Sequence, residues 1–412
     1  MLKKIIYISY DLEFLSIHAH EIILNLIKSG CKVSLFIPND VYHYFELHKD
    51  CKVHAVPVIF QCKFIRTIIF PLILTCILIA DIFRTNKPAL IYARQNYMGL
   101  PVILLACLLK IPYFAEVNGL IVAGSGKATQ KLKHFSKTWL ESRILHLSGA
   151  VIVPSNALKK RMMDRYRIPS EKIYAIPNGF NELIFNPRET RTMMCRKIEF
   201  KKNDFVVGFI GSMGEWQGIE VLKKAIEKTF LVDTSIKFLL VGDYSPDSSI
   251  KKIRFASADG ARNITDFIKT KGYEGNIIYH RFVKYESSAD FMNCCDVLIA
   301  PYTTAYKKFG GGSPMKLYAY LACAKPVIIS NLGEWTDSLA LLKHNAAYLI
   351  PPNDSQALVK AIIELKNNED LRKKMGQNGR YFALKERRWS HSSAKIMNIY
   401  NRKFNRLRSI SK

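Results

Sequence analysis

The sequence predicts an α/β protein built from two Rossmann-like units, and three observations support this fold class. Short apolar runs typical of buried parallel strands alternate with amphipathic, helix-like runs. The alternation stops in a charged, aperiodic stretch at residues 186–203 and then restarts. The chain has 412 residues, which is long for a single core but natural for two domains of roughly two hundred residues each.

Residues 1–185 form the first expected domain. Its strand-like runs read KKIIYIS, KVSLFIP, ALIYAR, PYFAEVN, AVIVPS and KIYAIPNG, and helix-like runs between them cover 19–29, 98–109 and 156–166. Gly30 suits the carboxyl end of the first helix, and Ser155 suits the N-cap of the third. We expect a parallel sheet with helices on both faces.

Residues 204–385 form the second expected domain, with 186–203 as the linker. Its strand-like runs read FVVGFIG, IKFLLVGD, NIIYH, DVLIAP and AAYLI, and its helices are expected near 219–228, 261–271 and 287–294. A single amphipathic helix is expected over 354–374. Residues 380–408 continue as one or two basic helices, and the segment 386–412 is expected to cross back and pack on the first domain.

Composition narrows the class of partner. The formal net charge of +27 favours phosphate-bearing partners, namely anionic membrane, nucleic acid or nucleotide-linked substrates, without choosing among them. The nine cysteines form no CxxC pair and no ligand spacing, so we interpret them as reduced core residues of a cytosolic protein. The first ten residues already contain the strand-like segment KKIIYIS, so no secretory signal is expected.

One segment, TIIFPLILTCILIA at 67–80, raises the question of a membrane. It is shorter than the ~20 residues of a spanning helix, and Pro71 interrupts it. A buried core helix is the first interpretation. The alternative is an interfacial anchor whose cations, Lys63, Arg66 and Arg84, face lipid phosphates.

The stretch KKFGGGSPMKLYAYLACAKPVIIS at 307–330 is the main candidate for a binding site. Its three glycines free the backbone, Ser313 suits an N-cap, and Pro314 suits the first helical position. A lysine in the first turn, Lys316, opposes the helix dipole unless an anion lies in front of the helix. The sequence therefore predicts a phosphate site here, or else a flexible turn with a solvated lysine.

Ligands of open parallel sheets bind at the carboxyl ends of the strands, so we expect a cleft where the two units face each other. The residues at these positions are Arg94, Glu116, Asn118, Asn178, 211–218, Asp243 and 310–316.

With these loops identified, the chain resembles the retaining nucleotide-sugar glycosyltransferases of family 4, which have the two-domain GT-B fold. The resemblance extends over nearly the whole chain. It rests on the motifs EVNG, PSNALKKRM, IPNGFNELIFNP, GFIGSMGEWQGIEVL, GGSPMKLYAYLACAKPVI, AAYLIPPND and LRKKMGQNGR.

The resemblance implies roles for particular residues. The second domain would hold the nucleotide diphosphate. Gly211, Ser212 and Gly218 correspond to the turn where the backbone approaches the donor phosphates, and Ser313 and Lys316 correspond to the family's diphosphate-binding loop. The nucleotide-sugar-binding candidates also include Gly311, Gly312 and Leu317. Catalytic candidates are Lys316, Glu116 and Asn118, and acceptor-binding candidates are Arg94, Asn118 and Asn178. For Glu116, Asn118 and Arg94 a structural hydrogen bond or ion pair at a strand end is the alternative, and for Gly211 and Gly218 it is a tight turn without a ligand.

The resemblance also implies a mechanism. Cleaving the bond from an anomeric carbon to a diphosphate leaves negative charge on the departing oxygen, which Lys316 and the helix N-terminus would stabilise. Family members react with retention and usually without a metal, so no cofactor is expected. A carboxylate pair like that of glycoside hydrolases is then not required.

The chain departs from the family pattern at three places. The E-x7-E pair is absent because its positions carry Gly311 and Ala319, and the second glutamate of that pair holds the ribose. Losing this contact is expected to weaken nucleotide binding roughly tenfold to a hundredfold. Ala324 replaces a glycine and would be strained if its backbone is left-handed. The Arg and Lys that often accompany the GSMGEWQG turn are replaced by Glu215 and Gln217.

The expected function is therefore transfer of a sugar from a UDP- or GDP-sugar to a glycan or lipid-linked acceptor, in bacterial surface polysaccharide assembly (capsule, O-antigen or lipopolysaccharide). We expect the protein in the cytoplasm, peripheral to the inner face of the plasma membrane. The alternatives are a catalytically silent homologue that assists another transferase, and a basic nucleic-acid-binding protein. For the expected transferase we do not expect a nucleic-acid partner.

Overall fold

The computed structural model describes residues 3–10, 16–39, 49–59, 63–94, 96–119, 128–188, 200–201, 203–242, 258–281, 283–309 and 312–405. The chain divides into two compact units. The first comprises Met1–Pro177 together with Trp389–Lys412, and the second comprises Asn178–Arg388. Residues 178–185 and 386–388, which the sequence interpretation assigned elsewhere, thus lie in the second unit.

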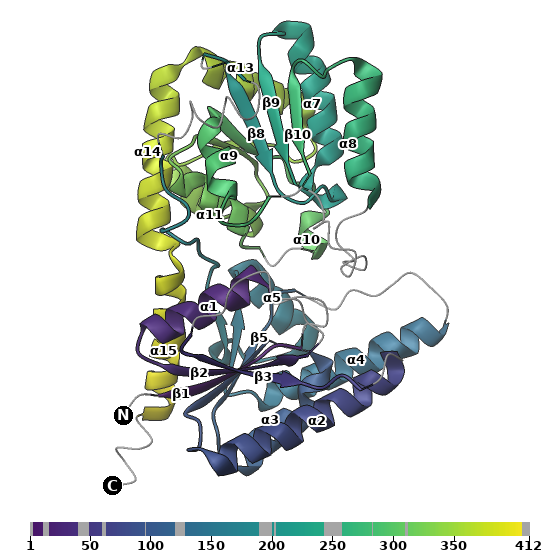
Figure 1. The fold of residues 1–412 in the computed structure, drawn as a ribbon, viewed down its shortest axis with the longest axis vertical. Helices are drawn as coiled ribbons and strands as arrows, with labels where there is room; N and C mark the ends of the chain where they lie inside the picture. Colours follow the sequence, from purple (N-terminus) through teal and green to yellow (C-terminus); the bar gives the residue numbers. More distant parts are fainter. Residues whose placement is uncertain are drawn as a thin grey trace. The chain divides into compact units, whose positions relative to one another are not determined.

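The first unit contains a seven-stranded, all-parallel sheet in the order β3-β2-β1-β4-β5-β6-β7 (Figure 1). Its strands are β1 Lys4–Ile8, β2 Lys32–Pro38, β3 Cys51–Val56, β4 Leu90–Arg94, β5 Tyr113–Glu116, β6 Ala150–Val153 and β7 Ile173–Ala175. Its helices are α1 Ile17–Lys28, α2 Lys63–Arg84, α3 Leu100–Leu108, α4 Ala128–Leu147, α5 Asn156–Tyr166 and α15 Trp389–Tyr400, with short 3-10 turns at Tyr97–Gly99 and Ser170–Lys172 and a terminal turn at Asn401–Asn405.

The second unit repeats this plan with six parallel strands in the order β10-β9-β8-β11-β12-β13. Its strands are β8 Val206–Ile210, β9 Lys237–Val241, β10 Ile277–His280, β11 Val297–Ala300, β12 Val327–Ser330 and β13 Tyr348–Ile350. Its helices are α7 Ile219–Val232, α8 Ala258–Lys271, α9 Ser288–Cys294, α10 Tyr306–Phe309, α11 Met315–Ala322, α12 Ser338–Lys343, α13 Ser355–Asn367 and α14 Glu369–Glu386, with 3-10 turns at Glu215–Gln217 and Gly333–Thr336. Both orders are that of a doubly wound Rossmann sheet, which confirms the predicted fold class.

Local signals placed several helix ends correctly. α5 covers the predicted residues 156–166, and the Ser155 hydroxyl accepts a hydrogen bond of 3.1 Å from the backbone of Leu158. Gly30 follows α1 with a φ of 81°, a conformation that glycine adopts without strain. Ala324 has a φ of 55°, so this alanine does occupy the left-handed conformation in which we expected strain.

Two predictions about helices were wrong. The single helix expected over 354–374 is divided at Asn368, whose side chain accepts a hydrogen bond of 2.9 Å from Leu371 N and so caps a second helix, α14. The apolar segment 67–80 belongs to a longer helix, α2, which continues through Pro71. Within the first unit, α15 packs against α1. The predicted linker 186–203 lies mostly outside the described residues, but Arg188 binds Asp290 of the second unit at 2.8 Å.

Helix α14 packs closely on the end of α11 because two of its residues are glycines. A Cβ on Gly376 would lie 2.2 Å from the carbonyl oxygen of Ala324, and a Cβ on Gly379 would lie 2.7 Å from a methyl group of Leu321. No side chain fits at the first of these distances, so the backbones would have to separate.

We therefore predict that Gly376→Ala lowers the free energy of unfolding of the second unit by about 1–3 kcal/mol, the usual cost of overpacking. Gly275→Ala is the matched control, because a Cβ at Gly275 would meet no atom within 4 Å. Urea denaturation of both variants measures the difference, and equal midpoints would contradict the packing argument.

Candidate functional site

The turn after β8 packs closely against the residues that follow β11 and β9. Gly218 has a φ of 83°, and a Cβ there would lie 1.8 Å from the carbonyl oxygen of Pro301, which follows β11. A Cβ on Gly242 would lie 1.9 Å from the carbonyl oxygen of Gly211. Glycine is required at 218 and 242 for this approach. Since β8 and β11 are the strands at which the sheet order reverses, the turn lies where ligands of such sheets bind.

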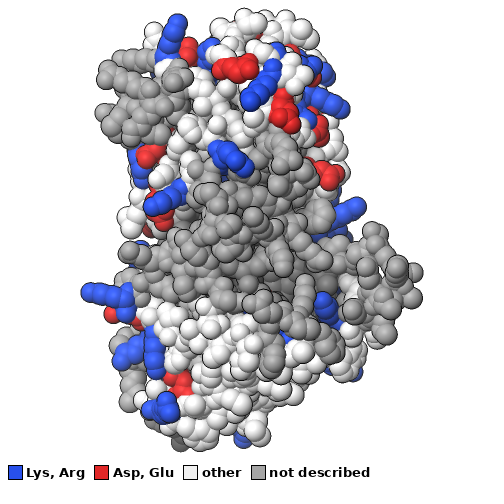
Figure 2. All heavy atoms as spheres, turned by 45° about the vertical axis from the view of Figure 1, so that its right-hand side comes forward, with Lys and Arg blue, Asp and Glu red and all other residues white. Residues whose placement is uncertain are grey.

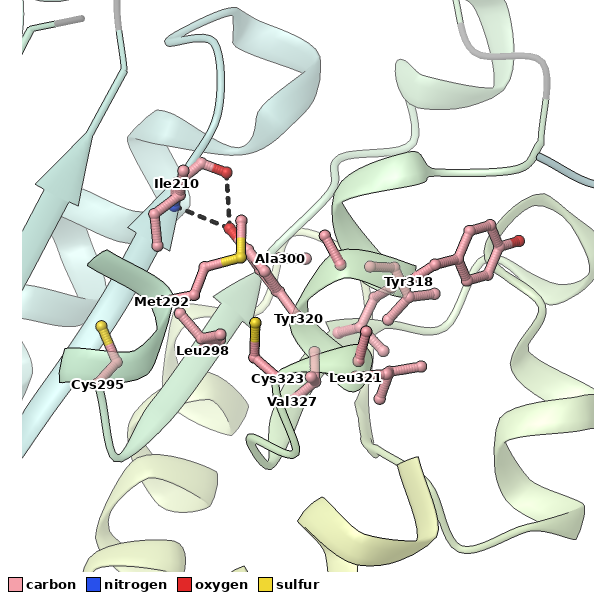
Figure 3. Close-up of a cluster of buried hydrophobic side chains, with 14 of the residues drawn as sticks. Ile210, Met292, Cys295, Leu298, Ala300, Tyr318, Tyr320, Leu321, Cys323 and Val327 are labelled. Atoms are coloured by element: carbon pink, nitrogen blue, oxygen red, sulfur yellow. Dashed lines mark hydrogen bonds between the residues drawn. The ribbon is translucent and has the colours of Figure 1, made fainter. Parts of the chain in front are cut away.

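The amino end of α11 reaches the same turn because its residue Tyr320 is bound to the end of β8. The Tyr320 hydroxyl accepts a hydrogen bond of 2.8 Å from Ile210 N and donates one of 2.7 Å to Ile210 O. Figure 3 shows both bonds within the apolar cluster around α11 and β11. Lys316 stands four residues before Tyr320, on the same side of the helix, so it is directed at Gly211.

Lys316 carries a buried ammonium group. Its Nζ lies 4.1 Å from the ring centroid of Phe209 and 5.0 Å from that of Tyr302. A Cβ on Gly211 would lie 3.0 Å from the same atom. The described residues supply no hydrogen-bond partner and no carboxylate for it, and burial lowers the pKa of Lys316 well below its ordinary value.

Other polar atoms nearby are also buried without a hydrogen-bond partner among the described residues. They are Trp216 Nε1, Gln217 Oε1 and Thr303 Oγ1, from the loops that follow β8 and β11. The Trp216 ring stacks on Tyr302 with centroids 6.1 Å apart, and Gln217 Nε2 donates to Ser212 Oγ at 3.1 Å. Buried polar groups are normally paired, so this group together with Lys316 indicates a site for a polar ligand.

Ser313 does not cap α11, which corrects the sequence interpretation. Pro314 occupies the N-cap position and no side chain caps the helix, so its first N–H groups are open to a ligand. The Ser313 hydroxyl instead accepts a hydrogen bond of 2.9 Å from Asn178 N and pairs with the Tyr318 hydroxyl at 3.0 Å. The Asn178 side chain donates to Ser313 O at 2.8 Å, so this acceptor candidate supports the loop before α11.

The same chain of hydrogen bonds continues to the end of α14. Tyr318 donates to Asp337 at 2.6 Å, and Arg387 donates to Asp337 at 3.0 Å while lying over the Tyr318 ring. This network links the loop before α11 to Asp337 and to the end of α14. None of Tyr318, Asp337 and Arg387 was predicted, because their partners are distant in sequence.

In the first unit, Glu116 is a buried carboxylate with several partners. His18 Nδ1 lies 3.2 Å from Oε1, Asn118 donates to Oε1 at 2.6 Å, and Tyr7 lies 3.4 Å from Oε2. Burial alone would raise its pKa, but His18 and Arg94 outweigh it and lower the pKa to about 2. Arg94 is paired with Glu116 in the sheet register and also donates to Ser16. This geometry matches the structural interpretation of Glu116, and His18 was not predicted.

The remaining site candidates divide as follows. Gly312 is buried with a φ of 79°. The side chains of Leu317 and Ala319 lie on the side of α11 that packs into the apolar core. Gly311 and Asp243 lie outside the described residues. Among the residues that the structure describes, no three His, Cys, Asp or Glu side chains are grouped to hold a metal ion.

Two family models match adjoining stretches of the chain. The model described as Glycosyl transferases group 1 matches residues 191–382, and the model described as Glycosyltransferase Family 4 matches residues 15–182.

Curated relatives are distant. An uncharacterized glycosyltransferase of Methanocaldococcus jannaschii is 26% identical over 248 residues, which are 58% of this chain and 62% of that protein. The O-antigen chain mannosyltransferase C of Escherichia coli is 26% identical over 243 residues, 58% of this chain and 57% of that protein. The capsular polysaccharide biosynthesis glycosyltransferase CapM of Staphylococcus aureus is 22% identical over 306 residues, 73% of each chain. The first two matches span less than two thirds of the relatives' length.

Solved structures share the fold over almost the whole chain. The sucrose-phosphate synthase of Thermosynechococcus elongatus superposes with a TM-score of 0.75 at 19% identity, covering 98% of this chain and 99% of that chain. Anabaena HepE in complex with UDP superposes with a TM-score of 0.71 at 15% identity, covering 96% and 98%.

The buried Glu116 predicts a specific acid sensitivity. Because its pKa is about 2 in the folded unit and 4.5 ordinarily, its contribution to stability is complete above pH 4.5 and is lost as the pH falls toward 2. This difference in the pKa of Glu116 corresponds to roughly 3 kcal/mol in the free energy of unfolding.

We predict that Glu116→Gln unfolds more easily than the parent protein at neutral pH and that this gap closes on acidification. Glu215→Gln, at an exposed position, is the control. Denaturant midpoints measured across that pH range test this, and a gap that is independent of pH would contradict it.

Proposed function

We propose that this chain, which belongs to glycosyltransferase family 4 and has the GT-B fold, transfers a sugar from a nucleoside diphosphate donor to a glycan or lipid-linked acceptor. The observation that carries the proposal is the buried ammonium of Lys316 without a partner among the described residues, beside the uncapped amino end of α11. A diphosphate bound there would accept hydrogen bonds from both and pair with the cation.

The chemistry follows from this placement. As the bond between the anomeric carbon and the diphosphate breaks, negative charge grows on the departing oxygen. Lys316 and the first N–H groups of α11 stabilise that charge more than the ground state, which lowers the barrier. We propose retention of configuration, with the acceptor attacking from the side of the leaving group and the departing phosphate oxygen taking the acceptor proton. The proposal uses no metal ion.

Two further elements of the proposal concern the ligands. The UDP complex of HepE supports a UDP-linked donor, with a GDP-linked donor as the second choice. The ribose would have one contact fewer than in relatives with a glutamate, because α11 carries Ala319 at that place. We assign the acceptor to the first unit, near Arg94 and Asn118 at the ends of β4 and β5.

The biological setting is proposed from the relatives. O-antigen and capsular polysaccharide enzymes among them support a role in surface polysaccharide assembly. We place the protein in the cytoplasm at the inner face of the plasma membrane, where lipid-linked acceptors are found.

We predict that Lys316→Met lowers the affinity for UDP or GDP roughly tenfold to a hundredfold, the value of a charge-assisted hydrogen bond. The same variant keeps or raises the melting temperature without ligand, because it replaces an unpaired buried cation by an apolar side chain of similar length. Lys308→Met, at an exposed lysine of α10, is the control.

Calorimetry and thermal shift with each nucleotide provide the measurement. If the parent protein binds neither UDP nor GDP, the chain is a silent homologue and the proposal fails. If Lys316→Met destabilises the protein and leaves nucleotide affinity unchanged, Lys316 has a structural role only.

Binding should also be accompanied by uptake of a proton by Lys316. Burial lowers the pKa of Lys316 in the free protein, and a bound diphosphate raises it by favouring the charged form. Affinity therefore falls as the pH rises. The binding enthalpy should change with the ionisation enthalpy of the buffer, an effect that Lys316→Met abolishes; a buffer-independent enthalpy in the parent protein would contradict this.

A further inference from the structure

Three helices of the first unit form a layer on one side of its sheet. Helix α3 contacts both α2 and α4, and their inner sides contribute to the same core as β1 and β4 (Figure 1). We call the outward side of α2, α3 and α4 the three-helix face.

Helix α2 is long and apolar enough to cross a bilayer by length and composition, over Ile65–Arg84, yet only a third of this stretch is buried. Its inner side packs Phe70, Leu74 and Leu78 into the core. Its Asp81 is buried and binds Lys4 at 2.6 Å and Lys52 at 3.2 Å. A membrane-spanning orientation of α2 would break these contacts.

The outer side of the layer is strongly apolar. On α2 the exposed side chains recur every three or four residues, which places them in one stripe. The large hydrophobic residues exposed on the face are Ile65, Ile68, Leu72, Phe83, Leu104, Leu108, Phe135, Trp139 and Leu147. Cys76 and Cys107 are exposed there too, so the interpretation as core residues was wrong for these two. The other described cysteines are buried as expected, namely Cys31, Cys51, Cys294, Cys295 and Cys323.

The charge on the face has one sign. The two acidic residues of these helices, Asp81 and Glu141, are buried and bonded, the second to Tyr166. Arg84, Lys110 and Arg143 are exposed at helix ends or along α4. In the lower part of Figure 2, where the first unit is drawn, most of the described surface is uncharged and the charges at its margins are mostly Lys and Arg.

A basic cavity adjoins the carboxyl end of α2. It has a volume of about 1180 Å³, and Asp81 and Thr85 of this helix region contribute to its wall. Its lysines are Lys3, Lys4, Lys32, Lys52 and Lys87. The five lysines outnumber the two carboxylates of the cavity, Asp50 and Asp81, so a net positive charge lies beyond the exposed apolar stripe, as it does in proteins that bind anionic surfaces.

We infer that the three-helix face binds in the plane of an anionic lipid bilayer, with its apolar side chains in the headgroup region and its cations on lipid phosphates. Apolar contact and positive charge together are what such a surface recognises. A second copy of this chain fits less well, because a face-to-face pair would oppose cations without an exposed carboxylate between them.

The test is flotation of the full chain with vesicles. We expect binding to vesicles of phosphatidylcholine with phosphatidylglycerol, and weaker binding to phosphatidylcholine alone. Replacing Ile68, Leu72 and Phe83 by Ser should reduce binding at least roughly tenfold, since each of these side chains is at least half exposed and would lose apolar contact with the bilayer. The control replaces Leu231 and Leu339, exposed hydrophobics of the second unit, by Ser and should bind like the parent protein.

A second set of variants separates charge from apolar contact. Replacing Arg84, Lys110 and Arg143 by Gln should remove the preference for anionic vesicles and leave residual binding. In the parent protein, alkylation of Cys76 and Cys107, followed by peptide mass spectrometry, should slow when vesicles are added.

The inference does not depend on the donor site, so unchanged UDP or GDP binding reports that each variant is folded. The inference would be overturned if the Ser variant bound vesicles as well as the parent protein does, or if the parent protein did not bind vesicles at all. A dimer in solution that the Ser variant abolishes, without vesicle binding, would show that the face joins two copies instead.

Discussion

The pair of hydrogen bonds between the Tyr320 hydroxyl and the backbone of Ile210 determines the geometry of the second unit's site. It joins α11 to β8 where β8 ends, deep in an apolar cluster where breaking it would leave three polar groups unpaired. Because Lys316 lies one turn before Tyr320, the same contact directs its ammonium at Gly211. The glycine turn, the uncapped helix end and the cation therefore meet at the reversal of strand order.

Glu116 and Lys316 are both buried charged groups, and their hydrogen-bond partners distinguish a structural role from a ligand-binding role. Glu116 is surrounded by His18, Asn118 and Tyr7, and these contacts keep it ionised without any ligand. The described residues place the rings of Phe209 and Tyr302 beside the Lys316 ammonium and give it no hydrogen-bond partner, so burial disfavours its charge. In the proposed function, a bound anion would favour the charged form of Lys316. In the proposed reaction, the same attraction between the Lys316 ammonium and an anion stabilises the departing diphosphate.

Predictability differed between local and long-range features. Caps and strands depend on neighbours in sequence, so the bounds of α5 and the presence of two Rossmann-like sheets followed from pattern alone, although the bounds of the two units did not. The break at Asn368 was missed because a capping asparagine inside an amphipathic run preserves the apolar period. The role of Ser313 was missed because Asn178, 135 residues away, competes for its hydroxyl.

The sequence by itself determined that the chain forms two doubly wound sheets and that a glycine turn and a lysine lie at the start of helices in the second. Periodicity and turn chemistry encode these features within a few residues. Only the tertiary structure decided which buried polar groups of the described residues lack a hydrogen-bond partner, which carboxylates are ion-paired and which side of α2 is exposed. These properties depend on contacts between residues far apart in the chain, and a linear pattern does not contain them.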